Sequence, residues 1–247
     1  MFLSFLSFDT STSGPCLSNT LCLSTWPAVG FPAPEAAVSV KGYGGSGPLP
    51  PFDTATEVRS FAAWNGSMVG LFNRNDAGAA IFNLVDPFGA PPQSVLDAGP
   101  VTVYANSEPR GVVWNPAVGL WQMLFTTVGS LVFADSDGGV TSIVTGAPVM
   151  DATLAVVDAD AGIGSVVIAS IVQWAMEQSL SLRFIRREMS EYHSNVTVVS
   201  LVNGYALKNP SIVFSPAQSR FGVVWSDNRT TGVQREDIFF SGLACEP

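Results

Sequence analysis

The residues best suited to hold a ligand are two arginines and two short polar loops. Arg59 and Arg110 each stand shortly before a tryptophan that ends an apolar segment, and an arginine can bind a carboxylate through two parallel hydrogen bonds. The loops NRNDAG (residues 73–78) and SDNRTTG (residues 226–232) follow other apolar segments, and loops on a rigid scaffold often carry binding residues. The ligand-binding candidates are therefore Arg59, Arg110, Asn73, Arg74, Asp76, Asp227, Asn228 and Arg229.

The spacing of these residues does not favour catalysis. A hydrolase acting on an acidic sugar needs converging arginines, a nucleophile and an acidic proton donor. Counted back from Trp64 and Trp114, Arg59 and Arg110 differ by one position, so their side chains need not point the same way. Serine-hydrolase and glycine-rich phosphate-binding motifs are absent from the sequence. We expect surface or channel-lining arginines and assign no catalytic residue.

A metal or other cofactor is not expected either. Asp-x-Asp-x-Gly occurs at residues 135–139 and 158–162, a spacing that can place two carboxylates on calcium. Both segments lack the further acidic ligands of a full calcium loop, so ordinary turns are favoured and calcium stays the alternative. The single histidine, His193, has no cysteine nearby and is assigned to a loop.

The composition indicates an acidic, folded chain. Of its 247 residues, 47% are hydrophobic and 13% are charged, which is too apolar for a disordered protein. The net charge is −9, whereas a nucleic-acid-binding face needs clustered basic residues, so nucleic acid is not an expected partner. No apolar run reaches the roughly 18 residues of a membrane-spanning helix.

A repeated hairpin pattern organises the chain. Three segments align without gaps: RGVVWNPAVGLWQMLF from Arg110, TLAVVDADAGIGSVVI from Thr153 and PSIVFSPAQSRFGVVW from Pro210. Each has an apolar run, a turn of small and polar residues, and a second apolar run, as in a β-hairpin. A fourth copy, SFAAWNGSMVGLF from Ser60, has a shorter turn.

Further strands are expected after each hairpin. The third strands are predicted at residues 79–85, 130–135, 179–185 and 237–243, and the fourth strands at 93–96, 141–144 and 197–201. Four short strands in a unit of about 40–50 residues are typical of propeller blades. The sequence thus predicts an all-β fold, a small β-propeller of about four four-stranded antiparallel blades. Its units are residues 59–99, 110–146, 153–204 and 210–243.

Two parts of this assignment depend on weaker patterns. The last unit has no predicted fourth strand, and a propeller ring must close to protect its edges. We expect the strand at residues 36–41 (AAVSVK) to complete the last blade, so that the propeller spans residues 36–247 after a partly irregular segment, 1–35. A larger ring formed with other sequence or a second chain is the alternative. Residues 171–192 also contain good helix formers, and an inserted helix is the alternative there.

The last unit carries a family resemblance. Its sequence FGVVWSDNRTTGVQREDIFFSGL (residues 221–243) resembles repeats of bacterial secreted propellers of the sialidase-like and related Asp-box classes. The turn DSDGG (residues 135–139) is similar to an Asp-box, with Asp in place of the leading Ser. The resemblance implies a propeller and no particular activity, because this fold hosts enzymes, lectins and scaffolds.

The location follows from this resemblance, the low lysine content and the cysteines. Cys16, Cys22 and Cys245 lie near the two ends of the sequence, which fits one disulfide between the ends, with three free thiols as the alternative. We expect an extracellular protein or one of the periplasm or cell envelope.

The predicted function is a non-catalytic binding or interaction module for an unknown protein or carbohydrate ligand. The alternative is a sialidase-like glycoside hydrolase or another propeller enzyme. Tryptophans that end apolar runs are expected in the core: Trp64, Trp114 and Trp225. The others are expected nearer the surface, where they could stack on a sugar or peptide: Trp26, Trp121 and Trp174.

Overall fold

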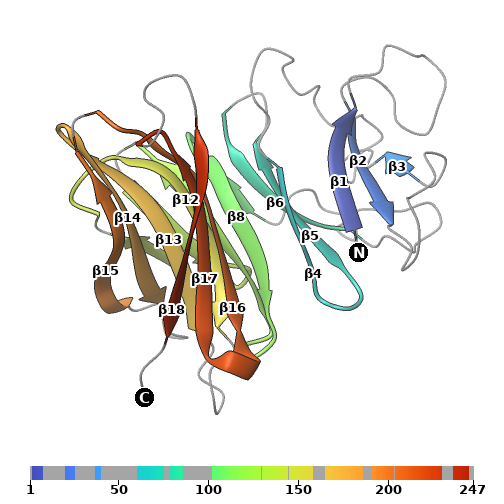
Figure 1. Ribbon diagram of the computed structural model, residues 1–247. Helices are drawn as coiled ribbons and strands as arrows, with labels where there is room; N and C mark the ends of the chain where they lie inside the picture. Colours follow the sequence, from blue (N-terminus) through green and yellow to red (C-terminus); the bar gives the residue numbers. More distant parts are fainter. Residues whose placement is uncertain are drawn as a thin grey trace. The chain divides into compact units, whose positions relative to one another are not determined.

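A computed structural model describes most of the chain from residue 60 onward and three strands before it (Figure 1). The described residues are 2–7, 20–25, 37–39, 60–74, 78–85, 102–128, 130–143, 145–157, 165–185, 191–202, 204–229 and 236–244. Within them every regular element is a β-strand, except for one 3₁₀ turn at Pro216–Gln218. No helix in this part of the chain is long and apolar enough to cross a membrane. The chain divides into two compact units, residues 1–112 and 113–247, which are described separately.

The first unit contains two antiparallel sheets. The strands of the smaller sheet are β1 (Phe2–Ser7), β2 (Thr20–Thr25) and β3 (Ala37–Ser39). Those of the larger sheet are β4 (Ser60–Trp64), β5 (Val69–Arg74), β6 (Ala80–Val85) and β7 (Thr102–Tyr104). Leu71, Phe72 and Phe82 are fully buried in the larger sheet, as expected for apolar strand residues.

The expected closing strand has a different partner. β3 falls within residues 36–41, but it pairs with β2, with Cys22 opposite Ser39, and the last sheet of the chain has three strands. The two units are described separately, so the pairing of this strand with the last sheet stays a prediction. A short connection joins β2 to β3, so their pairing costs less loop-closure entropy than pairing with a strand far along the chain.

The fourth strand of the larger sheet also lies elsewhere. It was predicted at residues 93–96, which are outside the described residues. The strand observed is β7, where Tyr104 is opposite Ala80 and Thr102 is opposite Phe82. β-branched and aromatic residues, as in Thr102-Val103-Tyr104, suit a pleated strand.

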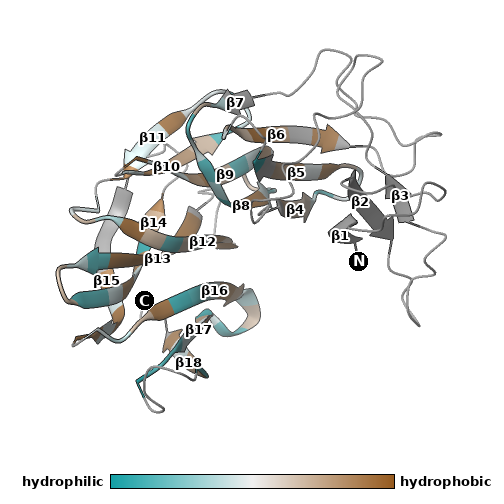
Figure 2. Cartoon of the chain, turned by 90° about the horizontal axis from the view of Figure 1, so that it is seen from above, coloured by the Kyte–Doolittle hydropathy of each residue, from teal (hydrophilic) through white to brown (hydrophobic). Residues whose placement is uncertain are grey.

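The second unit holds most of the remaining strands, and its boundary lies inside β8. One sheet contains β8 (Glu108–Asn115), β9 (Leu120–Thr127), β10 (Ser130–Asp135) and β11 (Val140–Ile143). The next contains β12 (Val149–Val157), β13 (Ser165–Trp174), β14 (Glu177–Ile185) and β15 (Glu191–Leu201). The last contains β16 (Leu207–Ser215), β17 (Arg220–Asp227) and β18 (Asp237–Ala244). Neighbouring strands follow chain order, and Figure 2 shows β9–β11, β12–β15 and β16–β18 as successive layers.

The segment 171–192 contains no helix in its described part. β13 and β14 form a hairpin with a turn at Ala175 and Met176. Leu180 and Leu182 belong to the core shared with β16–β18, whereas Ile185 belongs to the core shared with β9–β11, so both faces of β14 are buried. This period of two favours a strand over a helix. His193, expected in a loop, lies in β15 opposite Phe184, because β15 pairs along most of β14.

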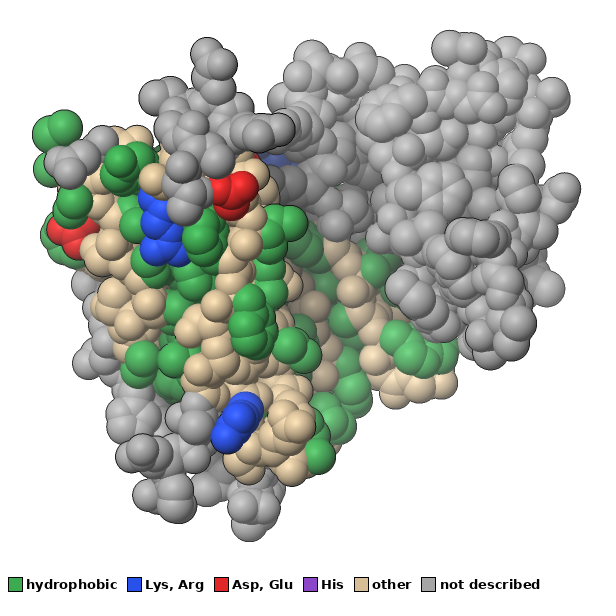
Figure 3. All heavy atoms as spheres, in the orientation of Figure 1, with side chains coloured by type: hydrophobic (Ala, Val, Ile, Leu, Met, Phe, Trp, Pro, Cys, Tyr) green, Lys and Arg blue, Asp and Glu red, His purple; other side chains and the backbone are tan. Residues whose placement is uncertain are grey.

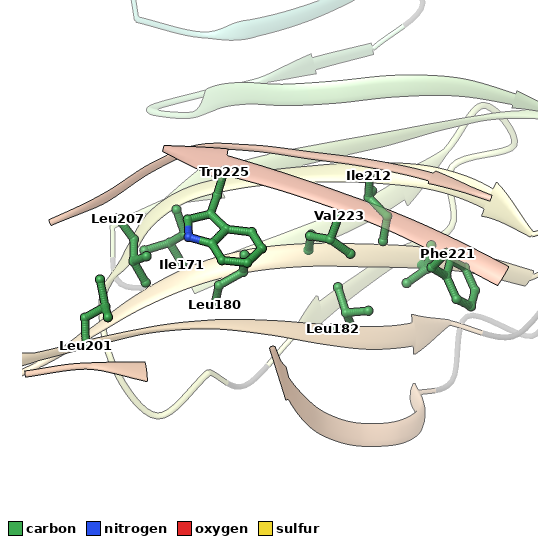
Figure 4. Packing of buried hydrophobic residues seen from close by; sticks show 11 residues of the cluster. Ile171, Leu180, Leu182, Leu201, Leu207, Ile212, Phe221, Val223 and Trp225 are labelled. Carbon is green, nitrogen blue, oxygen red and sulfur yellow. The ribbon is translucent and has the colours of Figure 1, made fainter. Parts of the chain in front are cut away.

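Two apolar cores join the three layers of the second unit. One lies between β9–β11 and β12–β14, and includes Leu124, Phe133, Leu154 and Ile168. The other lies between β13–β14 and β16–β18, and Figure 4 shows Trp225 extending from β17 toward Ile171 and Leu180. The middle layer is therefore covered on both faces.

The outer face of the last sheet is apolar and exposed. Phe240 and Ile238 project from β18, and Val224 and Val213 occupy neighbouring positions on β17 and β16. The ring of Phe240 lies over Gly222, where a Cβ would be 3.1 Å from it. Figure 3 shows hydrophobic side chains at the surface over these strands.

The tryptophans depart from the expected burial at several positions. Trp225 is 5% exposed, which confirms its core position, but Trp64 and Trp114 are only half-buried. Trp121, expected nearer the surface, is 4% exposed, because its ring packs 5.1 Å from that of Trp114 across the hairpin. Trp174 is 48% exposed, as expected.

Candidate functional site

The candidate residues of the first polar loop and the arginines are only partly described. Arg110 is buried in β8, and its Nη2 donates to Glu108 Oε2 at 3.0 Å. Its guanidinium therefore pairs with a carboxylate of the same strand, and its binding of a ligand stays a prediction. Arg74 is exposed at the end of β5, and Asn73 lies in the same strand. Arg59 and Asp76 fall outside the described residues.

The second polar loop is organised around a buried carboxylate. Asp227 is 0% exposed at the end of β17. Trp225 Nε1 donates to Asp227 Oδ2 at 2.8 Å, and the backbone N–H of Arg229 donates to Asp227 Oδ1 at 3.1 Å. The Arg229 guanidinium also pairs with Asp227 Oδ2 at 3.2 Å. One carboxylate thus ties together the strand, the start of the loop and the arginine.

Arg229 and Asn228 strengthen the same junction. The Arg229 guanidinium lies 4.0 Å from the ring centre of Phe239, which stacks on Trp225 at 5.9 Å. Asn228 Oδ1 accepts a hydrogen bond from the backbone N–H of Ala206 at 2.9 Å. The structure therefore brings together Asp227, Asn228 and Arg229, and the contacts described for them are internal. We infer that the side chains of the segment from Trp225 to Arg229 stabilise the end of the last sheet.

The turn after β10 uses its first aspartate in the same way. Asp135 Oδ1 accepts from the backbone N–H of Asp137 at 3.0 Å and of Gly139 at 2.8 Å. These bonds account for the Asp-x-Asp-x-Gly spacing as an Asx-type turn. Within the described residues there is no group of three acidic, histidine or cysteine side chains that could hold a metal. Residues 158–162 lie outside this part of the chain.

Gly139→Ala is expected to destabilise the protein by about 1–3 kcal/mol through overpacking. An added Cβ would lie 2.6 Å from Asp135 Oδ2, so the carboxylate that closes the turn would have to move. Urea denaturation measures the loss. Asp137→Ala is the matched control and should be nearly neutral, because the interaction of Asp137 with Asp135 uses its backbone N–H. Equal effects of both substitutions would contradict this account of the turn.

A cavity of about 360 Å³ lies where β11 passes into β12. The described residues of its lining are uncharged: Ser130, Ser142, Ile143, Thr145, Gly146, Ala147 and Pro148. Ser130 begins β10, which pairs with the end of β9, so the cavity is at the end of the sheet where second strands turn into third strands. The two polar loops named as ligand candidates, residues 73–78 and 226–232, also join the second to the third strand of their sheets.

Trp174 lies against Gly146, one of the residues that line the cavity. Its ring atom Cη2 is 2.9 Å from the position that a Cβ on Gly146 would take. Gly146 has a φ of +71°, so glycine suits this position both for its backbone and for the close approach of the indole. The backbone N–H of Gln173 donates to Pro148 O at 3.0 Å, which fixes the end of β13 beside the cavity rim.

Two glutamines hold the β13–β14 turn in place. Gln178 Nε2 donates to Gln173 Oε1 at 2.6 Å, and Gln178 Oε1 accepts from the backbone N–H of Leu207 at 2.6 Å. Gln173 Nε2 also donates to Ala175 O at 2.9 Å inside the turn. These contacts connect the turn to the start of β16 and predict a rigid platform under the exposed side chains.

Exposed apolar side chains gather at this end of the second unit. We call them the turn patch: Met150, Trp174, Met176, Val202 and Tyr205. The pairing of Leu201 with Gln178 places the connection from β15 to β16 beside the β13–β14 turn. Contiguous exposed apolar patches often mark binding surfaces.

The acidic groups described near this end do not resemble a catalytic pair. Ser200 Oγ donates to Glu177 Oε1. At the last sheet the exposed Glu236 pairs with Lys208, whose hydrogen bond and positive charge lower the pKa of Glu236. A general acid at neutral pH needs a raised pKa, so Glu236 is unsuited to that role.

Comparisons with known proteins name no family. Neither the known protein families nor the curated proteins contain a match to the sequence. Among solved structures, a putative 6-phosphogluconolactonase from Bacteroides uniformis is 12% identical, with a TM-score of 0.46, over 91% of this chain and 68% of that one. An α-L-arabinofuranosidase from Clostridium thermocellum is 11% identical, with a TM-score of 0.44, over 87% and 75%. Both similarities are too low to support a conclusion about function.

Sequence reasoning missed most of this site. Trp174 was named as a residue that could stack on a ligand, but its cavity was not foreseen. The lining residues are small and uncharged, and the segment Thr145-Gly146-Ala147-Pro148 reads only as a connection. Its glycine and proline were the available signal, because such residues mark a defined loop rather than a strand.

Proposed function

We propose that this chain is a non-catalytic binding module on a small β-propeller scaffold of about four blades. Successive sheets of three or four antiparallel strands in chain order support this fold. In the second unit the first strands of two successive sheets, β12 and β16, lie beside each other, as first strands do around a propeller axis.

The observation that carries the binding function is Trp174 beside an uncharged cavity. The indole is half-exposed, rests on Gly146 of the rim and belongs to the turn patch. Ligand sites are commonly concave and largely apolar, with a few polar groups, and the cavity combines Ile143 with three hydroxyl residues. Among the lining residues that the structure describes there is no carboxylate or histidine, whereas a glycoside hydrolase needs two carboxyl groups across the scissile bond.

Trp174→Ala is expected to weaken ligand binding by about tenfold or more and to leave folding nearly unchanged. Losing one aromatic contact of roughly 1.4 kcal/mol corresponds to that factor. Glycan and peptide arrays identify the ligand, and titration of wild type and variant measures the change. Val213→Ala, an exposed substitution on the outer face of β16, is the matched control and should bind like wild type.

A panel of fluorogenic glycosides tests the enzyme alternative. The proposal predicts binding without turnover by the wild-type protein. Robust hydrolysis that disappears in a folded Arg110→Ala variant would contradict the proposal and support a sialidase-like or other glycoside hydrolase instead.

We also propose an extracellular, periplasmic or cell-envelope location. The low lysine content and the position of the cysteines near both ends of the sequence support it. Cys16 and Cys245 fall outside the described residues, so their pairing stays a prediction.

A further inference from the structure

We propose that the cavity beside Trp174 binds a neutral sugar ring of a glycan, with the ring stacked on the indole. This inference rests on the proposed binding function and names the ligand class of the same site. Three features carry it: an uncharged hydroxyl-bearing lining, a positioned tryptophan at the rim and the size of the hollow.

The lining selects against charged ligands. None of the seven lining residues in the described part of the chain is ionisable, and an acidic sugar or phosphate beside these residues would lose hydration without gaining a cation from them. Ser130 and Ser142 each offer a hydroxyl that both donates and accepts. Thr145 Oγ1 donates to Ala147 O at 2.7 Å, which leaves its oxygen free to accept a bond from a ligand hydroxyl. Neutral sugars present the matching array of hydroxyl groups.

Trp174 supplies the apolar half of the recognition. The C–H groups on one face of a pyranose ring pack on an aromatic ring, while its hydroxyl groups point outward. The indole meets Gly146 through its edge atoms Cη2 and Cζ2 and stays 48% exposed. Because Gln173 and Gln178 fix the turn that carries it, little conformational entropy is lost when a ligand binds.

A proline-rich peptide is the main competing ligand, and the cavity fits it less well. Peptides of that kind dock in grooves lined by several aromatic rings. None of the lining residues that the structure describes is aromatic, and Trp174 is a single ring that lies against one of them, Gly146. The volume of about 360 Å³ is at the lower end of small-molecule sites, which are about 300–1,000 Å³, and suits one or two sugar rings.

The test uses the full chain and glycans of matched backbone. Neutral oligosaccharides displayed at high density on an array are compared with the same oligosaccharides carrying uronic or sialic acid, because multivalent display reveals weak single-site binding. Neutral glycans should bind and their acidic counterparts should bind clearly less. Binding constants are then measured by calorimetry with the best soluble oligosaccharide.

Variants separate stacking from positioning. Trp174→Phe should keep most of the affinity, and Trp174→Ala should lose about tenfold or more. Gly146→Ala keeps the indole but forces it to move and also strains the backbone, which has a φ of +71°, so it should lose affinity severalfold with an intact tryptophan. Ser142→Ala should weaken binding by removing one exposed hydroxyl. Thermal unfolding of each variant establishes that it is folded.

The outcomes distinguish this inference from the proposed function. Equal or better binding of acidic glycans, or Trp174-dependent binding of peptides instead of glycans, overturns the sugar assignment and leaves a binding module. Glycan binding that is unchanged in Trp174→Ala also overturns the site. Hydrolysis of the glycans, or no binding on any array, overturns the proposed function itself.

Discussion

Replacing Trp225 by alanine is expected to lower the free energy of unfolding by about 3–5 kcal/mol, because a large buried aromatic is lost and a cavity remains. Trp225 is 5% exposed and packs on Ile171 and Leu180 of the neighbouring sheet. Its ring also stacks on Phe239. Whole-domain stability is typically about 5–15 kcal/mol, so this change consumes a large part of it.

The matched control is Trp174→Ala, which removes the same side chain from an exposed site. Its cost should stay within about 1 kcal/mol, as for most surface substitutions. Chemical denaturation of both variants, monitored by circular dichroism, gives the comparison. Trp121→Ala should behave like Trp225→Ala because Trp121 is also buried. A Trp174 variant as unstable as the Trp225 variant would refute the observed packing.

Asp227→Ala is expected to cost about 3 kcal/mol, because it removes a buried acceptor shared by several donors. Trp225 Nε1 and the backbone N–H of Arg229 lose their partner, and the Arg229 guanidinium loses its ion pair. The Arg229 side chain is partly exposed, so water can compensate for part of this loss.

Asp227→Asn provides the conservative control. The amide keeps one oxygen acceptor in nearly the same place, so its cost should be about half that of Asp227→Ala. Urea denaturation at constant salt measures both. A neutral Asp227→Ala would contradict the structural role of this carboxylate.

The hairpins were accessible from the sequence because they depend on local information. Apolar runs of four to six residues separated by Asn-Pro or Ser-Pro are sufficient to indicate paired strands. The strands predicted at residues 130–135 and 179–185 correspond to β10 and β14. Within residues 171–192 the sequence allowed a strand or a helix. The described part forms strands, because the alternation of side chains at a period of two outweighs the helix propensity of the residues.

The identity of distant partners was decided only by the tertiary structure. Residues 37–39 have the pattern of a strand, but the pattern does not indicate which strand they pair with. They pair with β2, which is close along the chain and therefore costs little loop-closure entropy. Burial of Trp121 depends on Trp114 across the hairpin, and burial of Arg110 accompanies its ion pair with Glu108. None of these pairs has a spacing that marks it in advance.

For the candidate site, too, the sequence predicts some features and the tertiary structure decides the others. The sequence by itself determined an acidic, all-β chain with repeated hairpins, and it identified Trp174 as a tryptophan outside the core pattern. Only the tertiary structure places that indole against Gly146 and beside a hollow lined by small residues. Strand formation is set by side chains one to four positions apart, whereas a cavity is set by where separate strands end in space. The second property has no local signature, so it appears only once the sheets are packed.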